Sequence, residues 1–115
     1  MDSRIKTGIW VSAFVRRVGA DGTAAMVVRK GDTDAGLVLI KTNRLVDPGC
    51  MVYSPSRDLD GNRVWSRATG PDPVTEADAD AYIARQLSFD PDLWVIEVED
   101  RDGRHFLLEP VADAL

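Results

Sequence analysis

The sequence predicts a single α+β domain over residues 1–115, in which two α-helices pack on an antiparallel β-meander of about five to six strands. Three observations lead to this prediction. Apolar residues recur at helical spacing in two segments. Several short segments rich in β-branched and aromatic residues are separated by turns of hairpin length. The sequence contains no linker long enough to divide the chain into two domains.

The first helix is predicted from Gly8 to about Val18. Five apolar residues of this segment fall on one arc, which should face the sheet: Trp10, Val11, Phe14, Val15 and Val18. Thr7 is the expected N-cap, and Gly19 is expected to end the helix in the left-handed conformation. Because β-branched residues are frequent here, a strand is the alternative.

Four short strands are expected next, joined as a meander. Each is rich in Val, Ile, Tyr or Trp, and their ranges are Ala24–Lys30, Leu37–Arg44, Cys50–Pro55 and Arg63–Arg67. The intervening segments, residues 31–36, 46–49 and 58–61, contain the Gly, Asp and Pro residues that are typical of turns. Short connections favour antiparallel neighbours, which is why a meander is predicted.

A second helix is predicted from Glu76 to about Leu87, with Thr75 as its N-cap. Its inward stripe should comprise Ala79, Tyr82, Ile83 and Leu87. A strand over Leu93–Glu99 is expected to follow. The Asp102–Gly103 pair then predicts a hairpin into a last strand over His105–Glu109.

Charge is distributed unevenly along the chain. Residues 1–70 hold 11 of the 14 Lys and Arg residues and 7 of the 19 Asp and Glu residues, whereas residues 71–115 hold 3 and 12. The first part therefore carries a balance of +4 and the second a balance of −9. This asymmetry indicates either a polar binding surface or two complementary parts of one domain that fold against each other. The overall charge of −5 makes general nucleic-acid binding unfavourable.

Several classes of protein are disfavoured. The longest apolar run, Ala24–Val28, has five residues, whereas a membrane-spanning helix needs about 20. Residues 1–6 lack the apolar core of a secretory signal. The single cysteine, Cys50, allows no internal disulfide. We therefore expect a cytoplasmic protein without a membrane segment.

The catalytic and metal-binding patterns in the sequence are weak. The loop at residues 31–36 begins like a calcium loop but lacks the later ligands, so turn chemistry explains its two aspartates. Glu97 and Glu99 should share one strand face as a solvent-facing pair rather than as an acid–base pair. Cys50 and His105 would form a nucleophilic pair only if the fold assembled them. No catalytic residue, metal or cofactor is therefore assigned.

Four sequence segments together resemble those of a known family. They cover residues 10–17, 28–36, 63–70 and 89–100, and read WVSAFVRR, VRKGDTDAG, RVWSRATG and FDPDLWVIEVED. Their joint pattern resembles the bacterial family catalogued as domain of unknown function 1491, found mainly in alphaproteobacteria. The resemblance spans nearly the whole chain and implies a stand-alone cytoplasmic bacterial domain. It implies no activity, cofactor, partner or site residue.

The strongest candidate binding site is the predicted strand Arg63–Arg67. Side chains two residues apart share a strand face, so Arg63, Trp65 and Arg67 should point the same way. An indole between two guanidiniums can stack on a ring while the guanidiniums pair with an anionic group. The residues that would extend this surface, if the register allows, are Lys41, Arg44 and Tyr53. The structural alternative is that Trp65 covers the core edge and both arginines reach toward the acidic C-terminal part.

Two functions are compatible with these patterns. The favoured one is a non-enzymatic protein-interaction or regulatory module, with an unknown protein partner or self-association as a homodimer. The alternative is a small enzyme or ligand-binding domain for an anionic or nucleotide-like molecule at the basic and aromatic strand face. A deep pocket joining that face to Lys41 or Arg44 would favour the alternative. A flat apolar patch rimmed by charge would favour a protein partner.

Overall fold

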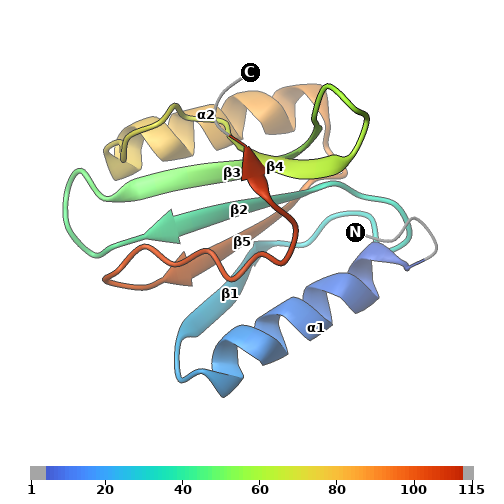
Figure 1. Ribbon diagram of the computed structural model, residues 1–115, viewed down its shortest axis with the longest axis horizontal. Coiled ribbons are helices and arrows are strands. Elements are labelled where there is room, and N and C mark those ends of the chain that lie inside the picture. The colour runs from blue at the N-terminus through green and yellow to red at the C-terminus, as the bar shows by residue number, and fades with distance from the viewer. Residues whose placement is uncertain (1–4, 113–115) are drawn as a thin grey trace.

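The computed structural model describes residues 5–112, which fold as two helices and one six-stranded sheet (Figure 1). In chain order the elements are α1 (Thr7–Ala20), β1 (Ala24–Arg29), β2 (Val38–Asn43), β3 (Cys50–Arg57), β4 (Arg63–Arg67), α2 (Glu76–Phe89), β5 (Trp94–Glu99) and β6 (Val111–Ala112). The segment near the N-terminus is therefore a helix, and the alternative of a strand there is wrong. The elements predicted up to β5 are all present, with small shifts of their ends.

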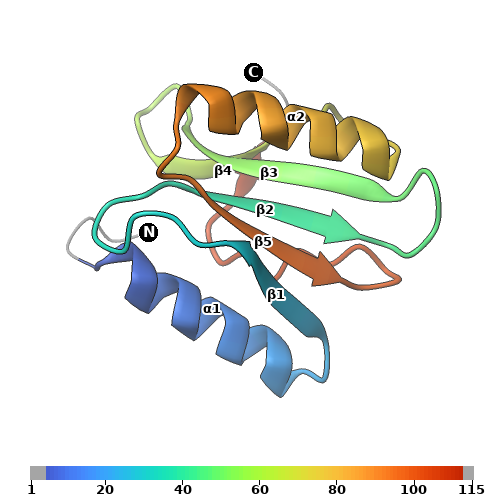
Figure 2. The same cartoon turned by 180° about the vertical axis from the view of Figure 1, so that it is seen from behind.

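The sheet is mixed, so the prediction of an antiparallel meander throughout is wrong. Its strand order is β1-β5-β2-β3-β4-β6 (Figures 1 and 2). Only β2, β3 and β4 form an antiparallel meander. β5 lies between β1 and β2, antiparallel to β1 and parallel to β2. The short β6 pairs with β4 in the parallel direction.

The loop between β1 and β2 explains why these two strands do not pair. It docks on the segment before β5: the Asp32 amide donates to the Asp92 carbonyl at 3.0 Å, and the Trp94 indole donates to the Asp32 carbonyl at 2.7 Å. A Cβ atom on Gly31 would lie 2.1 Å from the Asp92 oxygen, so this approach requires glycine. The apolar β5 therefore takes a central position, where both of its faces are covered.

The two helices cover opposite faces of the sheet. Neighbouring strand residues point to opposite faces. Ile40 of β2 packs in one core with Phe14 of α1, and Leu39 packs in another core with Ile83 of α2. The buried residues of the α1-side core are Val11, Phe14, Val18, Val38, Ile40, Met51, Tyr53, Trp65, Trp94, Ile96, Val98 and Leu107. Those of the α2-side core are Leu39, Cys50, Val52, Ala79, Ile83, Leu93 and Val95.

The ends of α1 differ from the predicted ones. Lys6, not Thr7, occupies the N-cap position, and it forms no side-chain cap. Thr7 is the first helical residue, and its buried hydroxyl donates to the Gly36 carbonyl at 2.8 Å, which ties the helix to the loop before β2. The helix continues through Gly19, and the left-handed conformation occurs instead at Gly22, where φ is 86°.

The predictions for α2 are confirmed. The Thr75 hydroxyl accepts a hydrogen bond from the Asp78 amide at 3.1 Å, as an N-cap should. Ala79 and Ile83 are buried, and two half-buried residues of the predicted stripe, Tyr82 and Leu87, pack against the same core. The helix extends two residues beyond the predicted end.

The predicted strand over His105–Glu109 is wrong. The turn at Gly103 forms, with φ of 74°, but the chain then crosses the α1 side of the sheet as an irregular segment (Figure 1). Phe106 has a φ of 60°, and its carbonyl accepts a hydrogen bond from Arg17 of α1. Leu107 is buried in the α1-side core. These long-range contacts hold the segment away from the strand ladder.

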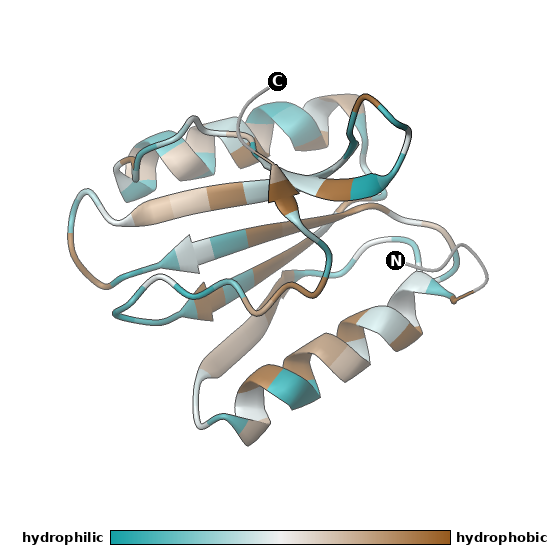
Figure 3. Cartoon of the chain, in the orientation of Figure 1, coloured by the Kyte–Doolittle hydropathy of each residue, from teal (hydrophilic) through white to brown (hydrophobic). Residues whose placement is uncertain are grey.

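β1 forms one edge of the sheet and is apolar along most of its length (Figure 3). Met26, Val27 and Val28 are 42%, 44% and 59% exposed.

No helix within residues 5–112 has the length and apolar character required to cross a membrane.

Candidate functional site

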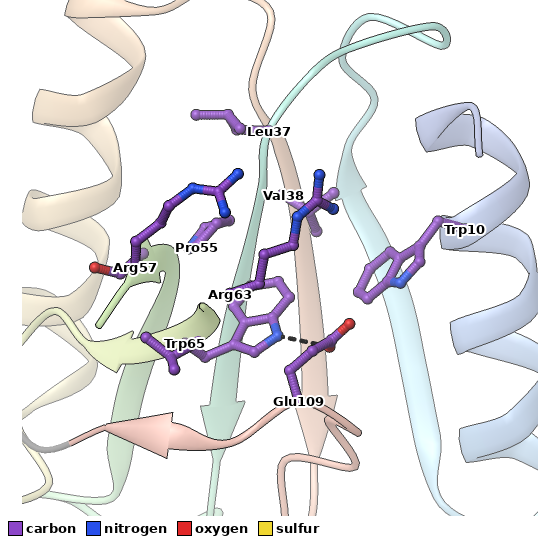
Figure 4. A pocket seen from close by; sticks show the side chains of 10 residues that line it. Trp10, Leu37, Val38, Pro55, Arg57, Arg63, Trp65 and Glu109 are labelled. Carbon is purple, nitrogen blue, oxygen red and sulfur yellow. Dashed lines mark hydrogen bonds between the residues drawn. The ribbon is translucent and has the colours of Figure 1, made fainter. Parts of the chain in front are cut away.

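A cavity of about 290 Å³ lies where α1 approaches the start of β4 (Figure 4). It is lined by Trp10, Leu37, Val38, Pro55, Ser56, Arg57, Arg63, Val64, Trp65 and Glu109. These residues come from α1, the start of β2 and the residue before it, β3, β4 and the irregular segment after β5, so segments far apart in the sequence assemble the cavity. We call it the Trp10–Trp65 pocket.

Two tryptophans form the aromatic wall of the pocket. The ring centroids of Trp10 and Trp65 are 5.8 Å apart, with an angle of 28° between the ring planes. Trp10 also stacks on Phe14 at 5.3 Å, and the Trp65 indole donates to the Glu109 carboxylate at 3.1 Å. Because each ring has a second partner, the wall is held in position before any ligand arrives.

Two arginines stand at the pocket, one on each strand of the β3–β4 hairpin. Arg57 and Arg63 are register partners, and Figure 4 shows both side chains among the residues that line the pocket. Arg57 donates to the Gly61 carbonyl at 2.9 Å. The Arg63 side chain forms no hydrogen bond or ion pair with any residue in the range 5–112. Within residues 5–112, β6 pairs with Trp65 and Ser66 alone, and no strand of this range covers the start of β4 at Arg63.

The structure brings two of the predicted site residues together. Arg63 and Trp65 line the pocket, whereas Arg67 lies at the other end of β4, where it is the register partner of Tyr53. Trp65 is only 4% exposed and belongs to the α1-side core, so the structural alternative describes this residue. The same alternative expects Arg63 to reach an acidic residue, and the Arg63 side chain reaches none within residues 5–112.

Tyr53 lies on the same side of the sheet as Trp65 but is buried in the core rather than placed at the pocket. Burial raises the pKa of its hydroxyl, and the nearby Arg67 opposes this rise. The side chain of His105 packs on the Tyr53 ring edge-on at 5.1 Å. Burial, and to a lesser extent Arg67, lowers the pKa of His105.

Lys41 points to the opposite face of the sheet, so it does not extend the basic surface. Its neighbour Ile40 lies in the α1-side core, which places Lys41 on the α2 side. The ammonium group is buried and binds three carboxylates, at 2.8, 2.9 and 3.1 Å, from Glu76, Asp80 and Glu97. Burial alone would lower the pKa of Lys41, but the hydrogen bonds to these carboxylates raise it well above its usual value.

The Lys41 cluster joins the cationic and anionic parts of the chain. Lys41 belongs to residues 1–70, and its three partners belong to residues 71–115. Glu97 is therefore not the solvent-facing residue that was expected, since its side chain is only 15% exposed.

The remaining predicted residue, Arg44, donates to the Arg101 carbonyl at 3.3 Å beside the turn at Gly103, away from the pocket.

The reactive side chains considered from the sequence are not assembled. Cys50 lies in the α2-side core, and His105 packs on Tyr53 on the α1 side. The Asp32 carboxylate accepts from the Ala35 amide at 3.0 Å, as turn chemistry predicts. Within residues 5–112 no group of three or more His, Cys, Asp or Glu side chains is arranged to hold a metal ion.

Sequence reasoning missed Trp10, Arg57 and Glu109 as site residues. The sequence placed Trp10 in the core stripe of the first helix. In the structure Trp10 stacks on Phe14 and also forms a wall of the pocket. Arg57 fell outside the predicted third strand, although its position directly before the turn at residues 58–61 was a signal that the strand could extend to it and bring it near Arg63. No sequence signal placed Glu109 beside Trp65, because its segment is irregular.

Comparisons with known proteins give a family and three similar structures. A family model described as "Protein of unknown function (DUF1491)" matches residues 5–108. The chain is similar to a DUF1491 family protein from Caulobacter crescentus in a crystal structure (46% identity, 93% of this chain, 98% of that chain, TM-score 0.79). It is also similar to an NMR structure of a DUF1491 family protein from the same organism (45% identity, 95% and 97% coverage, TM-score 0.78). A solution structure of a protein from A. tumefaciens is similar over 97% of this chain and 98% of that chain, with 27% identity and a TM-score of 0.75. No curated protein matches the chain.

Proposed function

The chain belongs to the DUF1491 family, and we propose that it is a non-enzymatic binding module that takes a small anionic ligand in the Trp10–Trp65 pocket. One observation carries this proposal. The Arg63 guanidinium lies beside an apolar and aromatic cavity and has no partner within residues 5–112. The proposal develops the ligand-binding domain that was the alternative function from the sequence, and we propose that it acts in the cytoplasm.

The chemistry of the pocket suits a ligand with an anionic end and an apolar body. A guanidinium presents a planar fork of N–H donors that can bind a carboxylate or a phosphate through two hydrogen bonds. Tryptophan rings can hold a ring or an aliphatic chain by stacking and apolar contact. A volume of about 290 Å³ is near the lower end of the range for small-molecule sites, roughly 300 Å³. A ligand of the size of one ring and a short chain therefore fits.

The placement of the reactive groups supports binding rather than catalysis. Glu109, the carboxylate that lines the pocket, accepts the Trp65 indole hydrogen bond. Neither Cys50 nor His105 lines the pocket, and the two lie on opposite sides of the sheet. The pair of Cys50 and His105 that the sequence offered is therefore not assembled at this site.

The proposal is tested by titrating the protein with ring-bearing anions such as phenylacetate and phenyl phosphate, using calorimetry. Binding to the wild-type protein that is lost in Arg63→Ala, and kept in Arg85→Ala, is the expected result. Arg85 is an exposed residue of α2 and serves as the matched control. Failure of every such anion to bind the wild-type protein would contradict the proposal.

A second candidate function is self-association, which agrees with the favoured function from the sequence. The observation that favours it is the exposed apolar edge of the sheet at Met26, Val27 and Val28. An unpaired edge strand can pair with the same strand of a second copy. β1 contains no Lys or Pro, and a register shift between Val27 and Arg29 confines its regular edge to the apolar residues before Val28.

A further inference from the structure

We infer that the Trp10–Trp65 pocket takes the carboxyl-terminal end of a peptide, which adds as a short strand beside the start of β4. This inference rests on the proposed function and names the class of ligand. The anionic group is the terminal carboxylate, paired with Arg63, and the apolar body is a side chain of the peptide. The inference depends on the direction of the Arg63 backbone groups, on the place where β6 begins and on the charge at the pocket.

The backbone N–H and C=O groups of Arg63 point away from β3. In an antiparallel hairpin, hydrogen-bonded and non-hydrogen-bonded residue pairs alternate. The Asp58 amide donates to the Asn62 carbonyl at 3.0 Å, so the next pair, which contains Arg63, is a non-hydrogen-bonded one. The same alternation turns the Trp65 amide outward, where it donates to the Pro110 carbonyl at 2.8 Å. The Arg63 backbone groups therefore point to the same outer edge of β4.

β6 leaves this part of the edge open. It runs parallel to β4 and pairs with Trp65 and Ser66. If the ladder continued backward, the donor to the Arg63 carbonyl would be the amide of residue 110, and Pro110 has no N–H. Within residues 5–112, neither backbone group of Arg63 has a hydrogen-bond partner across this edge. An added strand can therefore bind the backbone of Arg63 at both groups.

The position of β6 requires that an added peptide ends beside Arg63. Such a strand can continue past Asn62, but β6 blocks it at Trp65. Its carboxyl end lies at this point if it runs parallel to β4, and its amino end lies there if it runs antiparallel. The Arg63 guanidinium, which has no ion pair within residues 5–112, attracts a carboxylate and repels an ammonium group. The peptide therefore runs parallel to β4 and ends at the pocket.

The alternation of side chains determines which residue of the peptide enters the pocket. The peptide residue opposite Arg63 has its side chain on the same face, which is the α1 side where Trp10 and Trp65 form the wall (Figure 4). The next residue donates its amide to the Arg63 carbonyl and carries the terminal carboxylate. The penultimate side chain therefore fills the cavity of about 290 Å³, whose apolar lining includes Leu37 and Val38 and suits an aromatic or branched aliphatic group.

The test uses the peptide acetyl-Ala-Ala-Phe-Ala with a free carboxylate, by calorimetry at pH 7.5. The wild-type protein is expected to bind it at least about tenfold more tightly than phenylacetate, because the backbone contacts add to those of the ring and the carboxylate. Two analogues remove one contact each: a carboxyl-terminal amide removes the charge, and an ester in place of the last peptide bond removes the N–H that reaches Arg63. Each should bind at least about tenfold more weakly than the peptide.

Two further measurements connect these contacts to Arg63. The variant Arg63→Ala should lose both the peptide and phenylacetate, whereas Arg85→Ala should keep both. In the wild-type protein, the peptide should protect the Arg63 amide from hydrogen exchange, because this N–H donates to a carbonyl of the added strand. Phenylacetate, which has no peptide group, should leave the exchange of this amide unchanged.

The outcomes separate the inference from the proposed function. If phenylacetate binds and is lost in Arg63→Ala, but the peptide binds no more tightly, the inference is overturned and the pocket takes small free carboxylates. Equal affinities for the peptide, its amide and its ester also overturn the inference. If neither phenylacetate nor the peptide binds the wild-type protein, the proposed function fails together with the inference.

Discussion

Arg57 and Arg63 face each other directly across the β3–β4 hairpin, and neither forms an ion pair within residues 5–112. Like charges that are directly opposite in an antiparallel pair destabilise a sheet. Arg57 is partly satisfied by the Gly61 carbonyl, but Arg63 has no such contact. An anion bound at Arg63 would remove the repulsion, so we interpret the pair as an arrangement that lowers stability and serves binding.

Replacing Arg63 should therefore separate stability from binding. In Arg63→Thr, a residue suited to a strand replaces the cation, and we expect the free energy of unfolding without ligand to be unchanged or to rise by up to about 1 kcal/mol. Phenylacetate binding should be lost in the same variant. Urea unfolding and calorimetry measure the two effects. A marked loss of stability would show that Arg63 has a structural role instead.

The Lys41 cluster should be important for stability but not for binding. Lys41→Met leaves three carboxylates close together without their cation, and we expect a loss of about 2 kcal/mol in the free energy of unfolding. The value is moderate because Glu76 and Asp80 are more than half exposed, at 53% and 58%. Chemical denaturation measures it, with the exposed Lys30→Met as the control. Loss of phenylacetate binding in a folded Lys41→Met variant would contradict the conclusion that Lys41, on the α2 side of the sheet, plays no part in the pocket on the α1 side.

Asp100 should contribute stability that depends on pH. Hydrogen bonds from the Arg104 side chain and amide hold the pKa of Asp100 below its ordinary value of 3.8. Since the folded-state pKa is depressed, this stability is complete above about pH 4 and is lost as the pH falls through the folded-state pKa. Asp100→Asn should therefore be less stable than the wild-type protein at pH 7, and the difference should be smaller at an acidic pH below the ordinary pKa of 3.8. An equal difference at both pH values, or the same effect in the exposed Asp102→Asn, would contradict this.

The apolar edge at β1 should control self-association. If two copies pair through β1, Val28→Lys should shift the protein toward the monomer, because a charge would then lie in the interface. Leu59→Lys is the matched control, since Leu59 is 95% exposed in the β3–β4 turn, away from this edge. Sedimentation velocity over a range of concentrations measures the change. A wild-type protein that is monomeric throughout would rule out the second candidate function.

Local patterns predicted the elements of the fold but not the order of the strands. The helices α1 and α2 and the strands β1 to β5 follow from apolar periodicity and turn residues, which depend on near neighbours in the sequence. The position of β5 between β1 and β2 depends on the contact of Gly31 with Asp92, which joins distant segments. The irregular path after Gly103 depends in the same way on the hydrogen bond from Arg17 to the Phe106 carbonyl. Neither contact has a local sequence signal.

The candidate site was predicted only in part, because some of its residues are brought together by contacts between distant segments. Strand alternation correctly related Arg63 to Trp65, since it requires only the local period of two. The relation of either residue to Lys41 depended on the register across β2, β3 and β4, which places Lys41 on the opposite face. The contribution of Trp10 depended on how α1 packs over the sheet, and a helical stripe does not reveal which of its members borders a cavity.

The most direct test of the account is an NMR titration of the three tryptophan indole groups with phenylacetate. Trp10 and Trp65 line the pocket, and Trp94 is an internal reference because its indole donates to the Asp32 carbonyl outside the pocket. We expect saturable shifts for Trp10 and Trp65, little change for Trp94, and no shifts in Arg63→Ala. Unchanged Trp10 and Trp65 signals, or the same shifts in Arg63→Ala, would contradict the claim that Arg63 and the tryptophan wall form an anion-binding pocket.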